Sequence, residues 1–242
     1  MFKRAVQADP IQYWHSIRIF CASYNLHRSF TFFSCAFQLH ASFSEVHQNL
    51  VDRQTVQPGG ESRLSAKASD FAKLAGIPAV QSHCGFIPEN PNDPVYKATV
   101  EAMRDVATHC KRNKQNFRYE TGQETPITLI RAIRDAGVDN QGINFDLANL
   151  VMYGKANPVD AIELIAPYVQ GIHAKDGMWP TNPRDLGEEV PIGKGKVDFP
   201  RLIARLKELN YGGAVTIERE VSGPDQIRDV REAKKYLEQL IG

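Results

Sequence analysis

Short apolar segments alternate with amphipathic segments between residues 61 and 242, and this alternation constrains the fold more than any other feature of the sequence. β-branched and aromatic residues predict strands at 78–83, 117–120, 143–146, 169–173 and 214–218. Helical spacing of apolar residues predicts helices at 62–75, 93–112, 126–136, 158–166, 199–209 and 225–240. Phe71 and Val95 belong to the apolar sides of the first two helices, which are expected to face the core. Strands that alternate with helices form parallel sheets through right-handed crossovers. The alternation therefore predicts an α/β protein, either a (β/α)8 TIM barrel or a doubly wound open sheet.

The barrel is the favoured fold, although only about five strand–helix units are clear in the sequence. No G-x-G-x-x-G motif follows a predicted strand, which weakens the case for a dinucleotide-binding open sheet. A complete barrel needs about three more strands. Residues 1–60 must supply them, or the barrel is incomplete or irregular at its N-terminus. Aromatic and β-branched runs at 17–22 and 30–37 are candidates for two of these strands.

Residues 1–60 differ in composition from the rest of the chain. They hold 8 charged residues, whereas residues 61–242 hold 49, and they carry seven of the twelve Phe. One interpretation is an atypical N-terminal segment that forms a single domain with the barrel portion at 61–242. The alternative is a frame-shifted or misassigned gene start. The length of 242 residues suits one barrel domain overall.

Composition excludes several classes of protein. Hydrophobic residues make up 42% of the chain, but no apolar run reaches 18 residues, so no membrane span is expected. A formal net charge of +1 provides no basic field for nucleic acid. The four cysteines form no C-x-x-C pair, which excludes a zinc ribbon and a thioredoxin motif. Scattered cysteines without a secretory leader predict a cytoplasmic protein.

Four of the predicted strands finish on a residue that can bind a metal ion, namely Glu120, Asp146, His173 and Glu218. The carboxyl ends of the strands in a parallel barrel face one mouth, so these side chains are expected to converge there. Three carboxylates at one point repel one another unless a cation is present. Carboxylate oxygens with one imidazole predict Mn²⁺ or Mg²⁺, with Co²⁺ and Zn²⁺ as alternatives.

Each of these residues alone has an ordinary interpretation. A single carboxylate at a strand end is usually a loop-edge or helix-capping group, and a single His can be a core residue that bonds to a carbonyl. Four such residues, each closing a strand of one alternating array, favour a shared metal site.

Five stretches occur in the order and with the spacing of a known family. They are YETGQE at 119–124, FDLAN at 145–149, IHAKD at 172–176, PIGKGKVDF at 191–199 and TIERE at 216–220. By these stretches residues 61–242 resemble the sugar phosphate isomerase/epimerase superfamily, also called the xylose-isomerase-like barrel family. Residues 1–60 do not match the first strands of that family.

The resemblance implies a metal ion held by Glu120, Asp146, His173 and Glu218 in an isomerase or epimerase of a sugar or sugar phosphate. It also implies that Glu120 and Glu218 act as acid and base on opposite faces of the substrate. The metal would stabilise an enediolate, and a carboxylate would remove the proton next to the keto group. Return of the proton to the other face gives an epimer, and return to the neighbouring carbon gives an isomer.

Three further residues are predicted to contact the substrate. His83 ends the strand at 78–83 and should face the same mouth, with a buried structural His as the alternative. Lys175 follows His173 by two residues and could neutralise an anionic group, with a solvated loop lysine as the alternative. Asn149 stands where several ketose epimerases of the family place a substrate-contacting His.

Two features of the loop after His173 carry weaker predictions. Trp179 could cover the site from this loop, although a packing role is an equal alternative. The run from Gly193 to Gly195 is a poor phosphate motif and predicts a tight loop before Asp198, the expected N-cap of the helix at 199–209.

The expected partner is a small-molecule sugar, with neither nucleic acid nor a membrane, and a homo-oligomer is a further expectation. A dehydratase or a hydroxypyruvate-type isomerase would use the same metal site. An endonuclease of the family is less favoured, because Asn149 replaces one of its histidines and the loop at 177–197 contains no His. The alternative of another class is a non-catalytic or misfolded remnant, whose incomplete barrel would expose strand edges and associate.

Overall fold

The computed structural model describes residues 23–25, 37–38 and 60–242. The strand expected at 17–22 lies outside the described residues, and so does the strand expected at 30–37 except for Phe37. The two short strands that the structure describes in this part of the chain are β1 (Ser23–Asn25) and β2 (Phe37–Gln38).

Five parallel strands form the centre of the sheet, and all five occur where the sequence predicts them. They are β3 (Ala79–His83), β4 (Asn116–Glu120), β5 (Gln141–Asp146), β6 (Val169–Ala174) and β9 (Ala214–Ile217). The strand order is β1-β9-β6-β5-β4-β3-β2, in which β2 is parallel to β3 and β1 is antiparallel to β9. Within the described residues no ladder joins β1 to β2, so this part of the chain forms an open section of a barrel wall.

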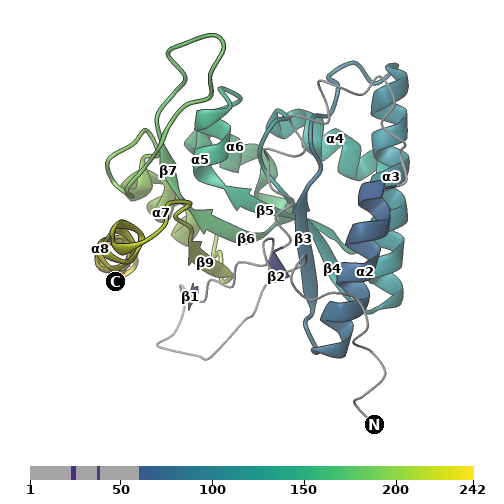
Figure 1. The fold of residues 1–242 in the computed structure, drawn as a ribbon, viewed down its shortest axis with the longest axis horizontal. Helices are drawn as coiled ribbons and strands as arrows, with labels where there is room; N and C mark the ends of the chain where they lie inside the picture. Colours follow the sequence, from purple (N-terminus) through teal and green to yellow (C-terminus); the bar gives the residue numbers. More distant parts are fainter. Residues whose placement is uncertain (1–22, 26–36, 39–59) are drawn as a thin grey trace.

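Helices follow the strands and lie on the outer side of the curved sheet (Figure 1). The structure contains α2 (Gly60–Leu74), α3 (Pro94–Arg112), α4 (Pro126–Ala136), α5 (Leu147–Met152), α6 (Pro158–Ile165), the 3-10 turn η2 (Ala166–Tyr168), α7 (Phe199–Glu208) and α8 (Pro224–Ile241). All six predicted helices are present, and their ends agree with the prediction within two residues. The short helix α5 and the turn η2 were not predicted.

Local sequence signals explain where several helices begin and end. Asp93 accepts a hydrogen bond from the N–H of Val95 at 2.8 Å, and Asp198 accepts one from the N–H of Arg201 at 3.2 Å. Both are N-caps that satisfy a backbone donor of the first helical turn. Gly137 ends α4 with φ +69°, a left-handed conformation that glycine adopts without steric cost. The N-cap predicted at Asp198 is confirmed.

Apolar side chains fill the space between the sheet and the helices. On β4, Phe117 and Tyr119 face the helices, and their rings meet edge to face with centroids 5.0 Å apart. Two residues expected in this core are exposed instead, Phe71 at 55% and Val95 at 57%. Helical rotation turns Ala72 rather than Phe71 toward the core. Val95 lies in the first turn of α3, one position before the buried Tyr96.

A small hairpin interrupts the chain between β6 and α7. It pairs β7 (Asp176–Gly177) with β8 (Glu189–Val190) in antiparallel register. The buried carboxylate of Asp176 accepts N–H bonds from Gly193 and Gly195 at 2.9 Å and from Val197 at 3.1 Å. A Cβ on Gly195 would overlap this carboxylate, so the close approach requires glycine. These bonds hold the tight loop that the sequence predicts before Asp198.

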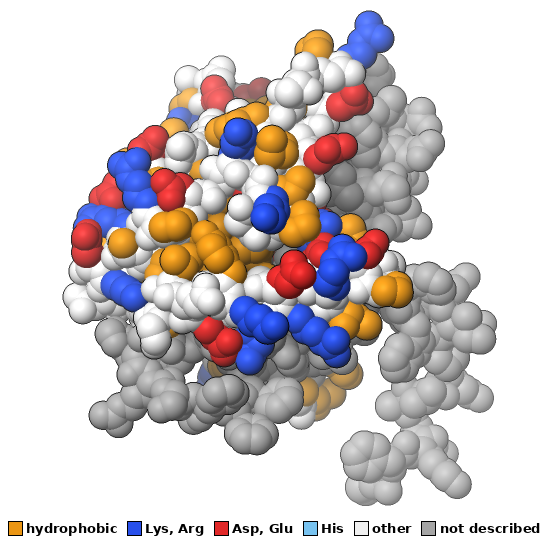
Figure 2. Space-filling view, turned by 90° about the vertical axis from the view of Figure 1, so that its left-hand side faces the viewer, with side chains coloured by type: hydrophobic (Ala, Val, Ile, Leu, Met, Phe, Trp, Pro, Cys, Tyr) orange, Lys and Arg blue, Asp and Glu red, His pale blue; other side chains and the backbone are white. Residues whose placement is uncertain are grey.

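The surface on the side of α8 carries charges of both signs. Figure 2 shows hydrophobic side chains gathered near the middle of this face, with lysine, arginine and acidic side chains around them. This face therefore presents no continuous field of one sign. No helix among the described residues is long and apolar enough to cross a membrane.

Candidate metal centre

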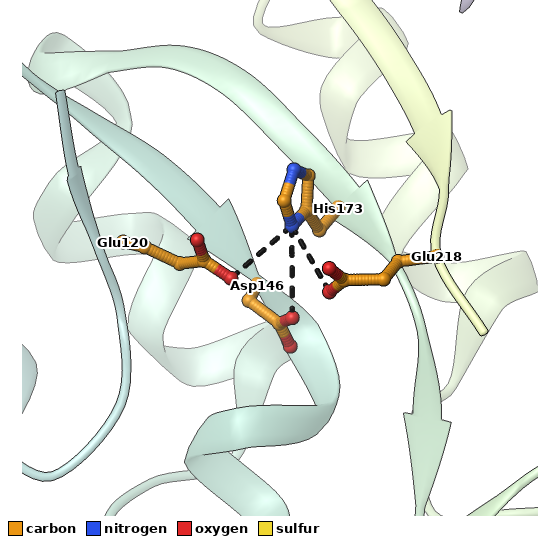
Figure 3. A group of neighbouring side chains, drawn as sticks. All are labelled: Glu120, Asp146, His173 and Glu218. Carbon is orange, nitrogen blue, oxygen red and sulfur yellow. Dashed lines mark hydrogen bonds and ion pairs between the residues drawn. The ribbon is translucent and has the colours of Figure 1, made fainter. Parts of the chain in front are cut away.

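Four buried side chains from four different strands meet at the carboxyl end of the sheet (Figure 3). Glu120 and Asp146 end β4 and β5, His173 lies one residue before the end of β6, and Glu218 follows β9 directly. One ligand atom from each residue lies within 4.8 Å of those from the others, and the residues are between 0% and 8% exposed. The sheet register explains the convergence, since Asp146 pairs directly with His173. The predicted meeting of these four residues is thus observed.

The imidazole of His173 is the centre of this cluster. Its Nδ1 lies 3.1 Å from Glu218 Oε2, 3.2 Å from Glu120 Oε1 and 3.9 Å from Asp146 Oδ2. Its Nε2 lies 3.2 Å from the side-chain amide of Gln81 on β3. A metal-ligating His typically donates its other N–H to a second group, which fixes the orientation of the ring. The Gln81 amide can accept that bond through its oxygen, because the two ends of an amide are interchanged by a flip.

One oxygen of Asp146 has no hydrogen-bond partner although it is buried. Asp146 Oδ1 accepts the N–H of Asn149 at 2.8 Å and caps α5, but Oδ2 receives no hydrogen bond. Two cationic side chains lie near Oδ2, with Lys175 Nζ at 3.8 Å and His173 Nδ1 at 3.9 Å. A buried carboxylate oxygen without a donor is costly. A divalent cation among the four side chains would satisfy it, so the residues present fit a metal ion.

The pKa values in the cluster reflect burial and crowding of negative charge. Burial raises the pKa of Asp146 well above its ordinary value, although the charge of Lys175 opposes this shift. Burial also acts to raise the pKa of Glu120, but the nearby imidazoles outweigh it and lower this pKa. Burial would lower the pKa of His173, but Glu218 and Glu120 raise it well above its ordinary value. Asp146 and His173 therefore bind a proton more tightly than they would in water, whereas Glu120 binds one less tightly because positive imidazoles lie beside it.

Lys175 lies inside the cluster rather than in solvent. It is 2% exposed, and its Nζ lies 3.0 Å from Glu220 Oε2, 3.4 Å from Glu218 Oε2 and 3.8 Å from Asp146 Oδ2. The ammonium also donates to Asn149 Oδ1 at 3.4 Å. The alternative of a solvated loop lysine is therefore wrong. Lys175 offsets part of the negative charge that the carboxylates bring together.

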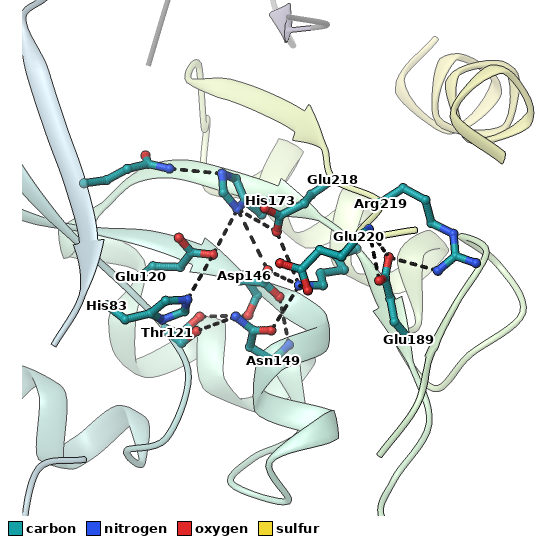
Figure 4. A network of polar contacts seen from close by, with 12 residues as sticks. His83, Glu120, Thr121, Asp146, Asn149, His173, Glu189, Glu218, Arg219 and Glu220 are labelled. Atoms are coloured by element: carbon teal, nitrogen blue, oxygen red, sulfur yellow. Dashed lines mark hydrogen bonds and ion pairs between the residues drawn. The ribbon is translucent and has the colours of Figure 1, made fainter. Parts of the chain in front are cut away.

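His83 and Asn149 reach the same mouth of the sheet (Figure 4). His83 Nε2 lies 3.7 Å from Glu120 Oε1, and about a third of the side chain is exposed. The alternative of a buried structural His is therefore wrong. Asn149 is buried and donates to the carbonyl of Thr121 at 3.0 Å, while its oxygen faces Lys175. All seven predicted site residues thus lie at the carboxyl end of the sheet. Trp179 lies in the loop after β7 and is partly exposed.

Two buried residues of this region, Gln81 and Glu124, are not among the predicted site residues. Alternation along β3 places Gln81 on the same side as His83, which is a signal that could have identified it. Glu124, in the loop after β4, is 3% exposed and its Oε1 has no hydrogen-bond partner. Burial raises the pKa of Glu124 to about 7. No pattern in the sequence distinguishes this glutamate from a solvated loop residue.

Comparison with known proteins identifies a matching family model and similar proteins. The model described as "Xylose isomerase-like TIM barrel" matches residues 58–240. An uncharacterized protein of Methanocaldococcus jannaschii is 27% identical over 217 residues, which cover 84% of this chain and 69% of that protein.

Among solved structures, the chain is similar to a xylose isomerase domain protein from Planctomyces limnophilus. The identity is 37% and the TM-score is 0.68, over 74% of this chain and 63% of that chain. This chain therefore spans less than two thirds of the length of the Planctomyces limnophilus protein. A D-tagatose 3-epimerase-like protein shares the fold with a TM-score of 0.61 at 19% identity, over 83% of this chain and 72% of that chain. A Mycobacterium smegmatis protein, solved in complex with magnesium, shares it with a TM-score of 0.57 at 20% identity, over 83% and 69% of the two chains.

Proposed function

Because the chain belongs to the xylose isomerase-like TIM barrel family, we propose that it is a metal-dependent isomerase or epimerase of a small sugar or sugar phosphate. The observation that carries this proposal is the convergence of Glu120, Asp146, His173 and Glu218 at the carboxyl end of the sheet. Active sites of barrel enzymes are built at this end. The epimerase-like protein among the structural neighbours supports the same class of reaction.

The four converging side chains are the proposed ligands of one divalent cation. Three carboxylates and one imidazole favour Mn²⁺ or Mg²⁺, with Co²⁺ and Zn²⁺ as alternatives. The magnesium complex of the Mycobacterium smegmatis neighbour supports a hard cation of this kind. When bound, the cation would polarise the keto group of the substrate and stabilise the enediolate that deprotonation creates.

We assign the proton transfer to Glu120 and Glu218. One carboxylate removes the proton from the carbon next to the keto group, and the other returns a proton. Return to the opposite face of the same carbon gives the epimer, and return to the neighbouring carbon gives the isomer. The Oε1 atom of Glu120 and the Oε2 atom of Glu218 lie on two sides of the His173 ring nitrogen, at 3.2 and 3.1 Å.

His83, Asn149 and Lys175 are the proposed substrate contacts. The partly exposed imidazole of His83 can donate to a substrate hydroxyl beside Glu120. Lys175 Nζ lies 3.8 Å from Asp146 Oδ2 and donates to Asn149 Oδ1 at 3.4 Å, so both side chains lie beside a proposed metal ligand. We further propose that the protein acts in the cytoplasm and that the substrate is a free small molecule.

The first test is a calorimetric titration with Mn²⁺ of the wild type, Glu218→Gln and the matched control Glu101→Gln on the exposed side of α3. We expect one binding site in the wild type and the control. We expect binding at least about a hundredfold weaker in Glu218→Gln, because the substitution removes a charged ligand. Proton exchange of ketoses in deuterated water then identifies the substrate. A folded wild type that binds no Mn²⁺ would contradict the proposal and favour a non-catalytic member of the family.

A further inference from the structure

The side chains of residues 218–220, directly after β9, point in two directions (Figure 4). Glu218 enters the metal cluster, and Glu220 Oε2 lies 3.0 Å from Lys175 Nζ. Arg219, between them, turns away toward Glu189. Neither Arg219 nor Glu189 has a part in the reaction proposed above, yet both side chains are nearly buried, at 12% and 10% exposed.

Glu189 binds both the backbone and the side chain of this segment. Its two carboxylate oxygens accept the N–H of Glu220, each at 3.1 Å. Its Oε1 also forms an ion pair with Arg219 Nη1 at 3.1 Å. A hydrogen bond to a charged acceptor is stronger than one between neutral groups. The carboxylate of Glu189 therefore sets the path of the chain directly after Glu218.

Helix α8 holds the segment from the other side. Arg219 Nε donates to Asp229 Oδ2 at 2.9 Å, and the Gln226 amide donates to the carbonyl of Arg219 at 2.8 Å. The Arg219 guanidinium thus lies between two carboxylates, Asp229 on α8 and Glu189 on β8. Such a two-sided contact leaves the backbone at this position little freedom.

The strand that carries Glu189 is itself anchored to the site. The β7–β8 ladder pairs Gly177 with Glu189, and β7 begins one residue after Lys175. The Asp176 carboxylate binds the N–H groups of the following loop, as described above. A continuous set of contacts therefore links Lys175, the hairpin and Glu189 to the segment that contains Glu218 and Glu220.

We propose that Glu189 is a positioning residue, which acts through Arg219 and the N–H of Glu220 to hold Glu218 as a metal ligand and Glu220 against Lys175. The inference rests on the proposed function, since it assigns a role within the same metal site. Loss of groups that orient metal ligands typically weakens metal binding by 10- to 100-fold. Because Glu189 acts through the adjacent backbone, we expect the lower end of this range.

The experiment is a Mn²⁺ titration by calorimetry of the wild type, Glu189→Ala, Glu189→Gln and Glu188→Gln. The last variant is a matched control, because Glu188 is the exposed neighbour of Glu189 and the charge change is the same. We expect about tenfold weaker binding in Glu189→Ala and wild-type binding in the control. Glu189→Gln should fall between them, because its amide oxygen still accepts the N–H of Glu220 but no longer pairs with Arg219.

Thermal unfolding of the metal-free variants separates positioning from a general loss of structure. Weaker binding by a variant that is fully folded at the titration temperature supports the positioning role. Wild-type affinity in folded Glu189→Ala overturns the inference and leaves the proposed function intact. If Glu189→Ala does not fold, Glu189→Gln decides in the same way. A wild type that binds no Mn²⁺ overturns both proposals.

Discussion

The two faces of the sheet are made by the same strands and have opposite chemistry. On β5, Ile143 and Phe145 face the helices and are fully buried among apolar side chains. The alternate residues Asn144 and Asp146 face the inner side and are equally buried, yet each has a polar atom without a hydrogen-bond partner. Neighbouring residues of one strand thus point to opposite faces of the sheet.

This difference shows where stability and chemistry reside. Burial of apolar surface on the outer face supplies most of the favourable free energy of folding. The inner face places carboxylates and an imidazole close together at a cost in desolvation, which a ligand can offset. Substitutions on the outer face should therefore change stability alone, whereas those on the inner face should change stability in a way that depends on metal or pH.

The largest effect is expected from Phe145→Ala on the outer face. Removal of this fully buried ring loses its burial and leaves a cavity, which should cost about 3–5 kcal/mol of unfolding free energy. Urea unfolding of the metal-free protein measures this cost. Val95→Ala, at an exposed position of α3, is the control and should stay within about 0.5 kcal/mol of the wild type. A loss below about 1 kcal/mol in Phe145→Ala would contradict the assignment of stability to this face.

The next effect is expected from Lys175→Met on the inner face. The substitution keeps an unbranched side chain, one atom shorter, but removes the ammonium from between Asp146, Glu218 and Glu220. Uncompensated carboxylates should lower the metal-free stability by about 3 kcal/mol. Saturating Mn²⁺ should restore most of it, since a cation then occupies the cluster.

The control for this prediction is Lys194→Met, which removes an exposed lysine of the loop after β8. Unfolding is followed with and without Mn²⁺ for both variants. A metal-free Lys175→Met as stable as the wild type would show that Lys175 does not compensate the carboxylates. The inner face would then cost less free energy of unfolding than we propose.

A smaller, pH-dependent effect is expected from Glu124→Gln at the mouth of the inner face. The folded-state pKa of about 7 lies above the ordinary value of 4.5, so the folded state binds the proton more tightly. This contribution to stability is complete below pH 4.5 and is lost as the pH rises through 7. The wild type should therefore lose about 2–3 kcal/mol relative to Glu124→Gln between pH 4.5 and about pH 8.

Urea unfolding at the two pH values measures this difference, with Glu101→Gln on α3 as the control. If the free energies of unfolding of the wild type and Glu124→Gln changed equally with pH, Glu124 would be hydrated in the folded state. The desolvation cost of the inner face would then be confined to the metal cluster.

The sequence predicted five strands, six helices and the four members of the cluster. These features depend on local periodicity and on the rule that parallel strands end at one mouth. The exposure of Phe71 contradicted the prediction, because spacing along a helix identifies a stripe more reliably than its exact centre. The hairpin of β7 and β8 and the contacts of Glu189 with the chain after Glu218 were not predicted, since the loop between these strands has no periodic pattern.

The order of strands and helices, the alternation that separates the two faces and the residues at the strand ends were determined by the sequence itself. Only the tertiary structure decided that Lys175 is buried among carboxylates, that Gln81 meets the ring of His173, and that Glu189 binds the chain after Glu218. The physical reason is that periodicity is a property of neighbours along the chain. Burial, charge pairing and hydrogen bonds between distant residues arise only when separate segments pack against one another.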